Sequence, residues 1–441
     1  MDETGFVMCG ALVHSTDAEP LEIMQHKCIG VKEGKIVFIE NEDALSEKIK
    51  EFGIPQTDIT YLKKGQFLCP GFVDTHLHAP QYPNCGKGLD MGLLDWLQTY
   101  TFPTEAKFSD LKYADMVYRK AVRRVLRNGT TTGCYFATLH TDATLLLCDV
   151  INEYGQRAYV GKVNMNIGSP DFYIESSVEE SLSETKRYIE EVKKRNYPHI
   201  TPIVTPRFAL SCCQELMSKL GDLAKAYDLP IQTHICETRD EVRIVGETFP
   251  GCESYAAVYD KAGLLTDKMV LAHGIYLSDN EIALIKARNS AISHCPNSNF
   301  SIRSGVLDLR RLEEARIKVG LGTDISGGYH PSMLNAIRTA VFVSNIHHIE
   351  AEHANYKALS VHEAFRLATL GGAKALGLDN RIGNFAVGKD FDALLIDPSA
   401  DGSHVDVLPD DSFSDSVDKY LYNGDDRNIL SIYVAGRKVI S

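Results

Sequence analysis

Short runs of apolar and β-branched residues alternate with longer segments of helical periodicity from residue 70 to about residue 328. Two of the longer segments, 110–129 and 177–196, carry apolar residues at helical spacing, and the first ends in the Asn-Gly pair typical of a helix C-terminus. Eight repeats of a strand followed by a helix predict a (β/α)8 barrel. The predicted strands lie at 71–79, 130–137, 157–166, 200–210, 230–238, 269–277, 290–299 and 319–327.

An open, doubly wound sheet is the structural alternative to the barrel. Such a sheet usually carries a glycine-rich phosphate-binding turn after its first strand. In this chain His76-Leu77-His78 stands at that position. The pattern therefore favours an α/β protein built on a TIM-like (β/α)8 barrel.

Both ends of the chain carry strand and hairpin patterns instead of this alternation. Residues 1–69 contain a predicted hairpin that turns at Glu33-Gly34, and residues 382–441 contain another that turns at Ala435-Gly436. We therefore expect residues 1–69 and 382–441 to form one small composite β-sandwich domain. Residues 70–381 are expected to form the barrel.

Composition and charge limit the classes of partner. The chain has 441 residues, of which 44% are hydrophobic and 24% charged, as in a globular protein with a large core. Its formal net charge of −13 argues against nucleic acid or an anionic membrane as a partner, because both require clustered Lys and Arg. The first residues lack the pattern of a signal peptide, and no apolar stretch approaches the roughly 18 residues of a membrane-spanning helix. We expect a cytosolic protein.

Two further features are interpreted as structural. Eleven cysteines are scattered along the chain without a CxxC pair, which predicts buried reduced thiols and not a disulfide framework. The acidic run at 408–426 is expected to be a solvated loop or terminal segment.

Side chains that suit a metal ion lie at the ends of four predicted strands. His76 and His78 point to the same face of the first strand, because strand side chains alternate with a period of two. The fifth strand carries His234, the sixth His273 and the eighth Asp324. The C-terminal ends of barrel strands meet at one face, so these five side chains are expected together. Imidazole nitrogens with one carboxylate suit Zn²⁺ or Fe²⁺ and leave room for a bound water.

Glu237 is the candidate proton carrier. A cation lowers the pKa of its bound water toward neutrality, and attack of that water on an sp² carbon then needs a group that moves protons. Glu237 lies three residues beyond His234, just past the predicted strand end. The alternative is a glutamate in the first turn of a helix, where the helix dipole favours it.

Five stretches of the chain together resemble the amidohydrolase superfamily, and the resemblance covers essentially the whole sequence. These stretches are PGFVDTHLHAPQ, THICET, LAHG, SHCPNSN and GLGTDISGG. The resemblance implies one Zn²⁺ per subunit, with Fe²⁺ as the alternative, bound by His76, His78, His234 and Asp324. It also implies that Glu237 shuttles protons and that His273 and Asp324 orient or deprotonate the water, and it leaves open whether His273 contacts the metal. A homodimer is what the superfamily suggests.

The resemblance extends to the substrate, a small purine base. The fourth predicted strand ends without the lysine that bridges two metals in dinuclear relatives, so a single-metal site is expected. Such sites in the superfamily commonly deaminate rings. An arginine guanidinium suits the 6-oxo group of guanine and repels the amino group that adenine offers there, and an aromatic ring can stack on the base. The expected substrate contacts are His78, Gln81, Arg207, Phe208, His234, Glu237 and Asp324.

The expected reaction is hydrolytic deamination of guanine to xanthine and ammonia, without an organic cofactor. Water adds to C2 of the ring, and Glu237 passes a proton toward N3. One alternative is a single-metal deaminase or chlorohydrolase that acts on cytosine, an adenosine-type nucleoside or a triazine. Another is a non-catalytic scaffold of amidohydrolase shape. Arg207 could instead be an ion-paired barrel residue, and Trp96 could lie at the pocket mouth or in the core.

Overall fold

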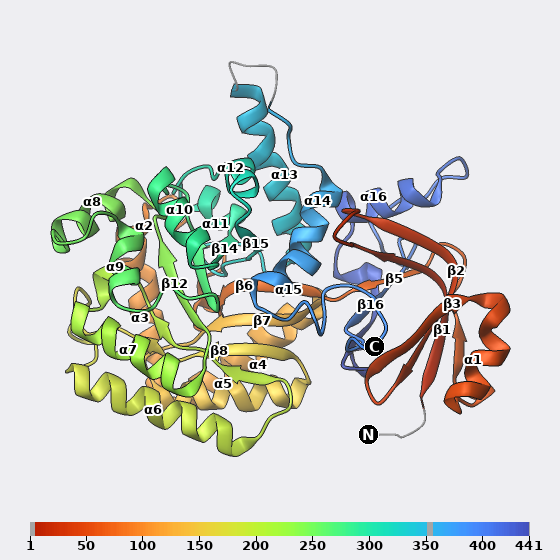
Figure 1. The fold of residues 1–441 in the computed structure, drawn as a ribbon, viewed down its shortest axis with the longest axis horizontal. Coiled ribbons are helices and arrows are strands. Elements are labelled where there is room, and N and C mark those ends of the chain that lie inside the picture. Colours follow the sequence, from red (N-terminus) through yellow and green to blue (C-terminus); the bar gives the residue numbers. More distant parts are fainter. Residues whose placement is uncertain (1–4, 351–355, 441) are drawn as a thin grey trace.

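The computed structural model describes residues 5–350 and 356–440, and it divides into two parts that lie side by side (Figure 1). The larger part holds alternating strands and helices from the middle of the sequence. In the smaller part, red strands from the start of the chain lie beside blue strands from its end. The chain crosses between the two parts where β5 (Phe67–Pro70) leads into β6 (Phe72–His78).

Each of the eight predicted strand positions is occupied by a strand. After β6 these are β7 (Thr130–Phe136), β8 (Arg157–Gly161), β9 (Val163–Asn164), β10 (Ile200–Pro202), β11 (Thr205–Pro206), β12 (Ile231–Ile235), β13 (Met269–His273), β14 (Ala291–His294) and β15 (Lys318–Leu321). The predicted third and fourth strands are each divided in two, at β8 and β9 and at β10 and β11. The strands form two parallel four-stranded sheets, β10-β8-β7-β6 and β12-β13-β14-β15, and β9 pairs with β11.

Backbone hydrogen bonds connect these two sheets at both edges. At one edge the amide of Val204 donates to the carbonyl of Pro230 at 3.0 Å. At the other edge the amide of Asp324 donates to the carbonyl of His76 at 2.8 Å. Within the described residues the eight strands do not form one continuous ladder, so the closed barrel that the repeats predict is observed only as two adjoining sheets.

Helices follow the strands and cover the outside of both sheets (Figure 1). The two predicted helices are confirmed as α4 and α6, and the hydroxyl of Ser177 caps the N-terminus of α6. The longer helices are α4 (Leu111–Arg127), α5 (Thr141–Tyr154), α6 (Val178–Arg195), α7 (Gln214–Tyr227), α8 (Arg239–Thr248), α9 (Tyr255–Lys261), α10 (Asp279–Ala287) and α13 (Met333–Glu350). The shorter ones are α2 (Leu93–Trp96), α3 (Phe102–Glu105), α11 (Pro296–Ser301), α12 (Leu309–Glu314), α14 (Val361–Arg366) and α15 (Gly372–Ala375).

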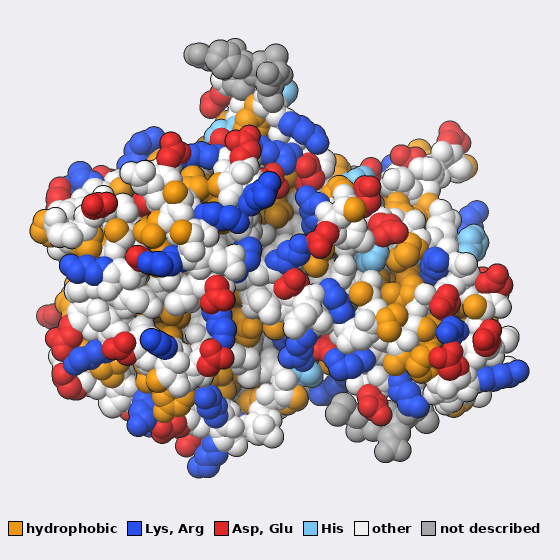
Figure 2. All heavy atoms as spheres, in the orientation of Figure 1, with side chains coloured by type: hydrophobic (Ala, Val, Ile, Leu, Met, Phe, Trp, Pro, Cys, Tyr) orange, Lys and Arg blue, Asp and Glu red, His pale blue; other side chains and the backbone are white. Residues whose placement is uncertain are grey.

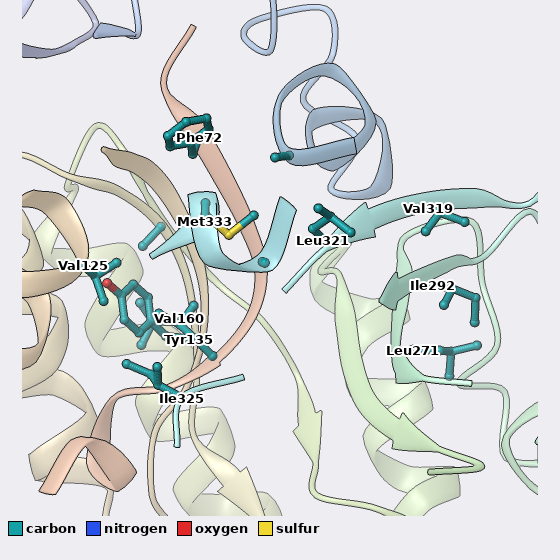
Figure 3. Packing of buried hydrophobic residues seen from close by; sticks show 14 of the residues in the cluster. Phe72, Val125, Tyr135, Val160, Leu271, Ile292, Val319, Leu321, Ile325 and Met333 are labelled. Carbon is teal, nitrogen blue, oxygen red and sulfur yellow. The ribbon is translucent and has the colours of Figure 1, made fainter. Parts of the chain in front are cut away.

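The main hydrophobic core lies between the strands and these helices (Figure 3). Tyr135 and Val160 extend from β7 and β8 toward Val125 of α4, and Leu271 and Ile292 lie on the neighbouring strands of the second sheet. Parallel strands covered by helices are buried on both faces, which is why their sequences are nearly continuous apolar runs. This packing fixes the strand ends, from which the polar side chains of the site extend.

The smaller part is one mixed sheet that both ends of the chain build together. Its strands are β1 (Phe6–His14), β2 (Glu22–Lys32), β3 (Lys35–Asn41), β4 (Ile59–Tyr61), β5, β16 (Ala393–Ile396), β17 (Ile429–Val434) and β18 (Arg437–Ile440), and its helices are α1 (Leu45–Phe52) and α16 (Phe413–Asn423). The order is β18-β17-β16-β5-β1-β2-β3, with β4 paired to β1. Both predicted hairpins are confirmed, with turns at Glu33-Gly34 and Ala435-Gly436.

The prediction that the cysteines are all reduced is wrong for one pair. Cys9 and Cys28 form a disulfide between β1 and β2, where they face each other in the antiparallel register. That register depends on strand pairing, which the separation of 19 residues does not reveal. The other nine cysteines are free thiols.

The prediction of a loop for the acidic run 408–426 is also wrong. This segment contains α16, whose N-terminus is closed by a capping box between Ser412 and Asp415. Val417, Tyr420 and Leu421 are buried on one face of the helix, so its acidic residues occupy the opposite, solvated face. The high local charge obscured the helical spacing of the three apolar residues.

On the face shown in Figure 2, acidic and basic side chains are interspersed over both parts of the molecule. The net negative charge is therefore spread out on this face and not gathered in one region. None of the helices in residues 5–350 and 356–440 is long and apolar enough to cross a membrane.

Candidate active site

Three histidines and one aspartate meet where the strands of both sheets end. His76 and His78 extend from the end of β6, His234 from β12, and Asp324 from the segment after β15. The Nε2 atom of His78 lies 3.2 Å from the Nε2 atoms of both His76 and His234. The Oδ1 atom of Asp324 lies 3.1 Å from Nε2 of His76 and 3.3 Å from Nε2 of His78.

The spacing of these four atoms fits a bound cation better than it fits hydrogen bonds. Nε2 of His78 faces two ring nitrogens and a carboxylate oxygen, yet a single ring nitrogen carries at most one proton. Four ligands placed tetrahedrally at about 2.0–2.1 Å from zinc lie about 3.3 Å from one another. The observed separations of 3.1–3.3 Å agree with that arrangement. The residues therefore fit a single Zn²⁺ or Fe²⁺ ion.

The surroundings keep these histidines ready to bind a metal. The Nδ1 atom of His234 donates to the backbone carbonyl of Arg207 at 2.6 Å, which leaves its Nε2 lone pair for the cluster. Burial lowers the pKa values of His76 and His78, so both rings are neutral near pH 7. Burial alone would raise the pKa of Asp324, but His76, His273 and His78 hold that pKa well below its usual range.

Glu237 and His273 lie together at the edge of the cluster. The Oε2 atom of Glu237 is 3.4 Å from Nε2 of His273, which in turn is 3.7 Å from Oδ2 of Asp324. Burial raises the pKa of Glu237 to about 7. Burial alone would lower the pKa of His273, but the carboxylates of Glu237 and Asp324 raise it. A carboxyl group with a pKa near neutrality can both accept and donate a proton under physiological conditions.

A pocket opens above the cluster and contains the other predicted contacts. Gln81 enters it from the 3-10 turn Ala79–Asn84, and Arg207 and Phe208 enter it from the segment after β11. Trp96 lines the pocket, and with 2% of its surface exposed it is also packed in the core. The lining comprises His78, Gln81, Leu93, Trp96, Leu97, Arg207, Phe208, His234, Glu237, His273, Ile302, Asp324 and Gly327.

Comparison with known proteins identifies the family. The pattern of the amidohydrolase family matches residues 67–439. The chain belongs to the amidohydrolase family. It is 48% identical to the guanine deaminases of Rattus norvegicus, over 99% of this chain and 97% of that protein, and of Homo sapiens, over 100% and 98%. The solved structure of the guanine deaminase from C. acetobutylicum with bound guanine is 38% identical, with a TM-score of 0.91 over 99% of this chain and 100% of that one.

This amidohydrolase site also contains a buried carboxylate that sequence reasoning missed. Glu105, the last residue of α3, is fully buried and pairs with Arg207 through two hydrogen bonds of 2.7 and 3.1 Å. Arg207 is therefore both ion-paired and part of the pocket wall. One weak signal was available: Leu97, Thr101 and Glu105 recur at a spacing of four, which would place the three side chains on one face of a helix.

Two more polar residues of this site come from the segment around α11. The hydroxyl of Ser304 donates to Oε1 of Glu237 at 2.9 Å, and Oδ1 of Asn299 accepts from Nδ1 of His273 at 2.9 Å. Asn299 is the last residue of the SHCPNSN stretch, and the sequence pattern predicted no role for it. Nothing in the local sequence distinguishes Ser304, because its partner lies 67 residues away in the chain.

Proposed function

We propose that this amidohydrolase hydrolyses guanine to xanthine and ammonia. The observation that carries the proposal is one pocket in which a candidate metal cluster and a carboxyl group of near-neutral pKa face an arginine and a glutamine. Similarity to guanine deaminases over the full length of the chain supports the same reaction.

Four residues would hold the cofactor: His76, His78, His234 and Asp324. Their donor set favours one Zn²⁺ per subunit, with Fe²⁺ as the alternative. A divalent cation at this position supplies electrostatic activation of water by lowering its pKa toward neutrality. His273 would orient that water together with Asp324.

Glu237 would carry the protons of the reaction. It accepts a proton from water as the water oxygen bonds to C2 of guanine, and it donates that proton toward ring nitrogen N3. The remaining proton of the new C2 hydroxyl then passes to the exocyclic nitrogen, the bond between C2 and that nitrogen breaks, and ammonia leaves as C2 becomes the 2-oxo carbon of xanthine. The pKa of about 7 allows Glu237 to exchange the proton in both directions at neutral pH.

Arg207, Gln81 and Phe208 would bind the purine. An arginine guanidinium only donates hydrogen bonds, so it suits the 6-oxo group of guanine. Phe208 would stack on the ring. His78, His234, Glu237 and Asp324 would lie on the side of C2, where the leaving group departs.

We further propose that the two adjoining sheets act as one (β/α)8 barrel spanning residues 70–381. Backbone hydrogen bonds at both sheet edges support closure. Residues 1–69 and 382–441 would form the composite β domain, as the sheet shared by β1, β5 and β16 supports. A homodimer and a cytosolic location stay predictions, to be checked by sedimentation and cell fractionation.

The test is ammonia release together with the ultraviolet change on mixing zinc-loaded protein with guanine, beside adenine and cytosine. We expect xanthine from guanine alone, and its loss in the Glu237→Gln variant. If the protein turned over adenine or cytosine instead, that base would be the substrate, and the role proposed for Arg207 would be wrong. Zinc binding without turnover of any ring would favour the scaffold alternative.

A further inference from the structure

We infer that Glu105 sets the selectivity of this pocket for 6-oxo purines by fixing the hydrogen-bonding pattern that Gln81 and Arg207 present to the ring. The inference rests on the proposed function, which supplies the purine. It adds a positioning residue that does not itself line the pocket.

Glu105 is the centre of a fully satisfied hydrogen-bond cluster behind the pocket wall. Its Oε1 atom accepts from Nε2 of Gln81 at 2.9 Å and from Nη2 of Arg207 at 3.1 Å. Its Oε2 atom accepts from Nη1 of Arg207 and from the hydroxyl of Tyr173, both at 2.7 Å. Four donors converge on one carboxylate with no exposed surface, so its orientation is determined from every side.

The first consequence is the orientation of the Gln81 side-chain amide. An ionised carboxylate only accepts hydrogen bonds, so the amide group that faces it at 2.9 Å is the NH₂. The amide oxygen of Gln81 therefore points away from Glu105. Within residues 5–350 and 356–440, that oxygen is contacted by the backbone amide of Ser326 at 3.4 Å, which is long for a hydrogen bond. Gln81 thus offers the pocket an acceptor.

The second consequence is the orientation of the Arg207 guanidinium. Glu105 engages both terminal nitrogens in a bidentate pair, and the ring of Phe102 lies 5.2 Å from the guanidinium carbon. The pair fixes the plane of the guanidinium and uses two of its five N–H groups. The buried charge is neutralised, and the remaining N–H groups stay available as donors. Arg207 thus offers the pocket a donor beside the acceptor of Gln81.

This donor–acceptor order matches guanine and opposes adenine. On the six-membered ring of guanine, the 6-oxo group accepts and the adjacent N1–H donates. Adenine presents the reverse, an amino donor beside an N1 acceptor. To donate a hydrogen bond to adenine, the Gln81 amide would have to rotate by half a turn. Its NH₂ group would then lose the hydrogen bond to Glu105, and the amide oxygen would face the Glu105 carboxylate instead. A buried polar group that faces a mismatched partner costs binding free energy. By fixing the orientations of Gln81 and Arg207, Glu105 therefore makes the pocket bind guanine more tightly than adenine.

The test compares how two non-reacting bases bind, so that it does not depend on turnover. Hypoxanthine has the 6-oxo group and N1–H of guanine without its 2-amino group, and adenine has the opposite pattern. We expect the zinc-loaded protein to bind hypoxanthine more tightly, as measured by calorimetry. In Glu105→Gln the ratio of the two dissociation constants should shift toward adenine by at least about tenfold, because the amide of Gln81 becomes free to rotate.

A matched control separates selectivity from stability. Glu175 is a second buried carboxylate, and it pairs with the buried Lys162 outside the pocket lining. Glu175→Gln makes the same chemical change to a buried ion pair. It should lower Tm as Glu105→Gln does and leave the ratio of dissociation constants unchanged.

Further outcomes are distinguishable. Equal weakening of both bases in Glu105→Gln would make Glu105 a purely structural partner of Arg207 and overturn the inference. If Glu105→Gln does not fold, Gln81→Met tests the same link, because removal of the amide should reduce the preference for hypoxanthine to the part that the donors of Arg207 provide, while the pair of Glu105 and Arg207 remains. A wild-type protein that does not turn over guanine would refute the proposed function, whereas the binding ratio would still report on Glu105.

Discussion

At the scale of single residues, the two oxygens of Glu237 have different surroundings. Oε1 accepts from the hydroxyl of Ser304, and Oε2 faces His273. The amides of Glu237 and Thr238 both donate to the buried carboxylate of Glu241, at 2.8 and 3.3 Å. The proton carrier is therefore fixed at its backbone and at one of its oxygens, which leaves the other oxygen for chemistry.

Ser304→Ala removes the hydroxyl that holds Oε1 of Glu237. That hydrogen bond favours the ionised carboxylate, so its loss should raise the pKa of Glu237 further above its usual value. We expect the acid limb of the pH profile of kcat/KM to move to higher pH and kcat to fall about tenfold, with KM little changed. Ser301→Ala is the control, because among the residues that the structure describes the hydroxyl of Ser301 bonds to Asn297 and not to Glu237. An unmoved pH profile would contradict the role of Ser304.

Metal binding should depend on pH through His76, His78 and His234. Burial lowers the pKa of each ring, so protons compete for these nitrogens only in more acidic solution than they would for an exposed histidine. The zinc content after dialysis should stay constant near pH 7 and fall as the pH drops below the usual histidine range. Elemental analysis across a pH series measures this directly.

Chelation should remove activity and lower Tm, because a ligand that binds only the folded state stabilises it. At a free zinc concentration 100 times the dissociation constant the gain is about 2.7 kcal/mol. His78→Ala removes the nitrogen that faces three other ligand atoms, and its Tm should no longer respond to zinc. Undiminished zinc binding by that variant would exclude the cluster as the metal site.

At the scale of secondary-structure elements, the site depends on close packing between strand ends. Gly322, just after β15, leaves room for the end of β6: a Cβ atom there would lie 3.0 Å from the Cβ of His76 and 2.7 Å from Oγ of Ser293. A side chain at this position would therefore force the hydroxyl of Ser293 to move and would crowd His76, on the strand that carries two of the candidate ligands.

Gly322→Ala should weaken zinc binding about tenfold while the protein still folds, because it shifts His76 without removing it. Titration against a competing chelator measures the affinity, and circular dichroism checks the fold. Gly246→Ala in α8 is the matched control, since a Cβ there meets nothing within 4 Å. Equal affinities in the two variants would show that β6 adjusts without cost.

Strand positions and strand-end residues could be predicted because each depends on a local pattern. The period of two within β6, and the position of each residue at a strand end, predicted that His76, His78, His234 and Asp324 lie at one face. Contacts set by tertiary packing could not be predicted. Glu105 reaches Arg207 across 102 residues of sequence, and the disulfide of Cys9 depends on the register of β1 against β2.

At the scale of the whole molecule, buried charges join the terminal sheet to the strands that carry the site. Arg157, at the start of β8, donates to Asp390 at 2.9 Å and to Asp392 at 3.1 Å, just before β16. All three side chains are at most 6% exposed. The contact lies at the opposite end of β8 from the active site, so it concerns assembly and not catalysis.

Arg157→Met would leave the buried carboxylate of Asp392 without its cationic partner, while Asp390 keeps its pairs with Lys35 and Arg381. We expect the free energy of unfolding, measured by urea denaturation, to fall by about 3–5 kcal/mol, with guanine turnover per folded molecule unchanged. Arg119→Met, which breaks a half-exposed pairing with Asp115 and Glu153, should cost less than about 1 kcal/mol. Similar losses in both variants would mean that the buried network contributes no more than a surface pair.

The order of strands in the terminal sheet has a consequence for the timing of biosynthesis. β5 lies between β1 and β16, and only Gly71 separates it from β6, the strand that carries His76 and His78. A nascent chain emerges from the ribosome N-terminus first, so β5 has no partner on one side until residues 393–396 are made. β5, which leads into His76 and His78, is therefore among the last strands to gain both of its neighbours in the sheet. We expect ribosome-bound chains that stop short of β16 to lack enzymatic activity, although they already contain every residue assigned to the site.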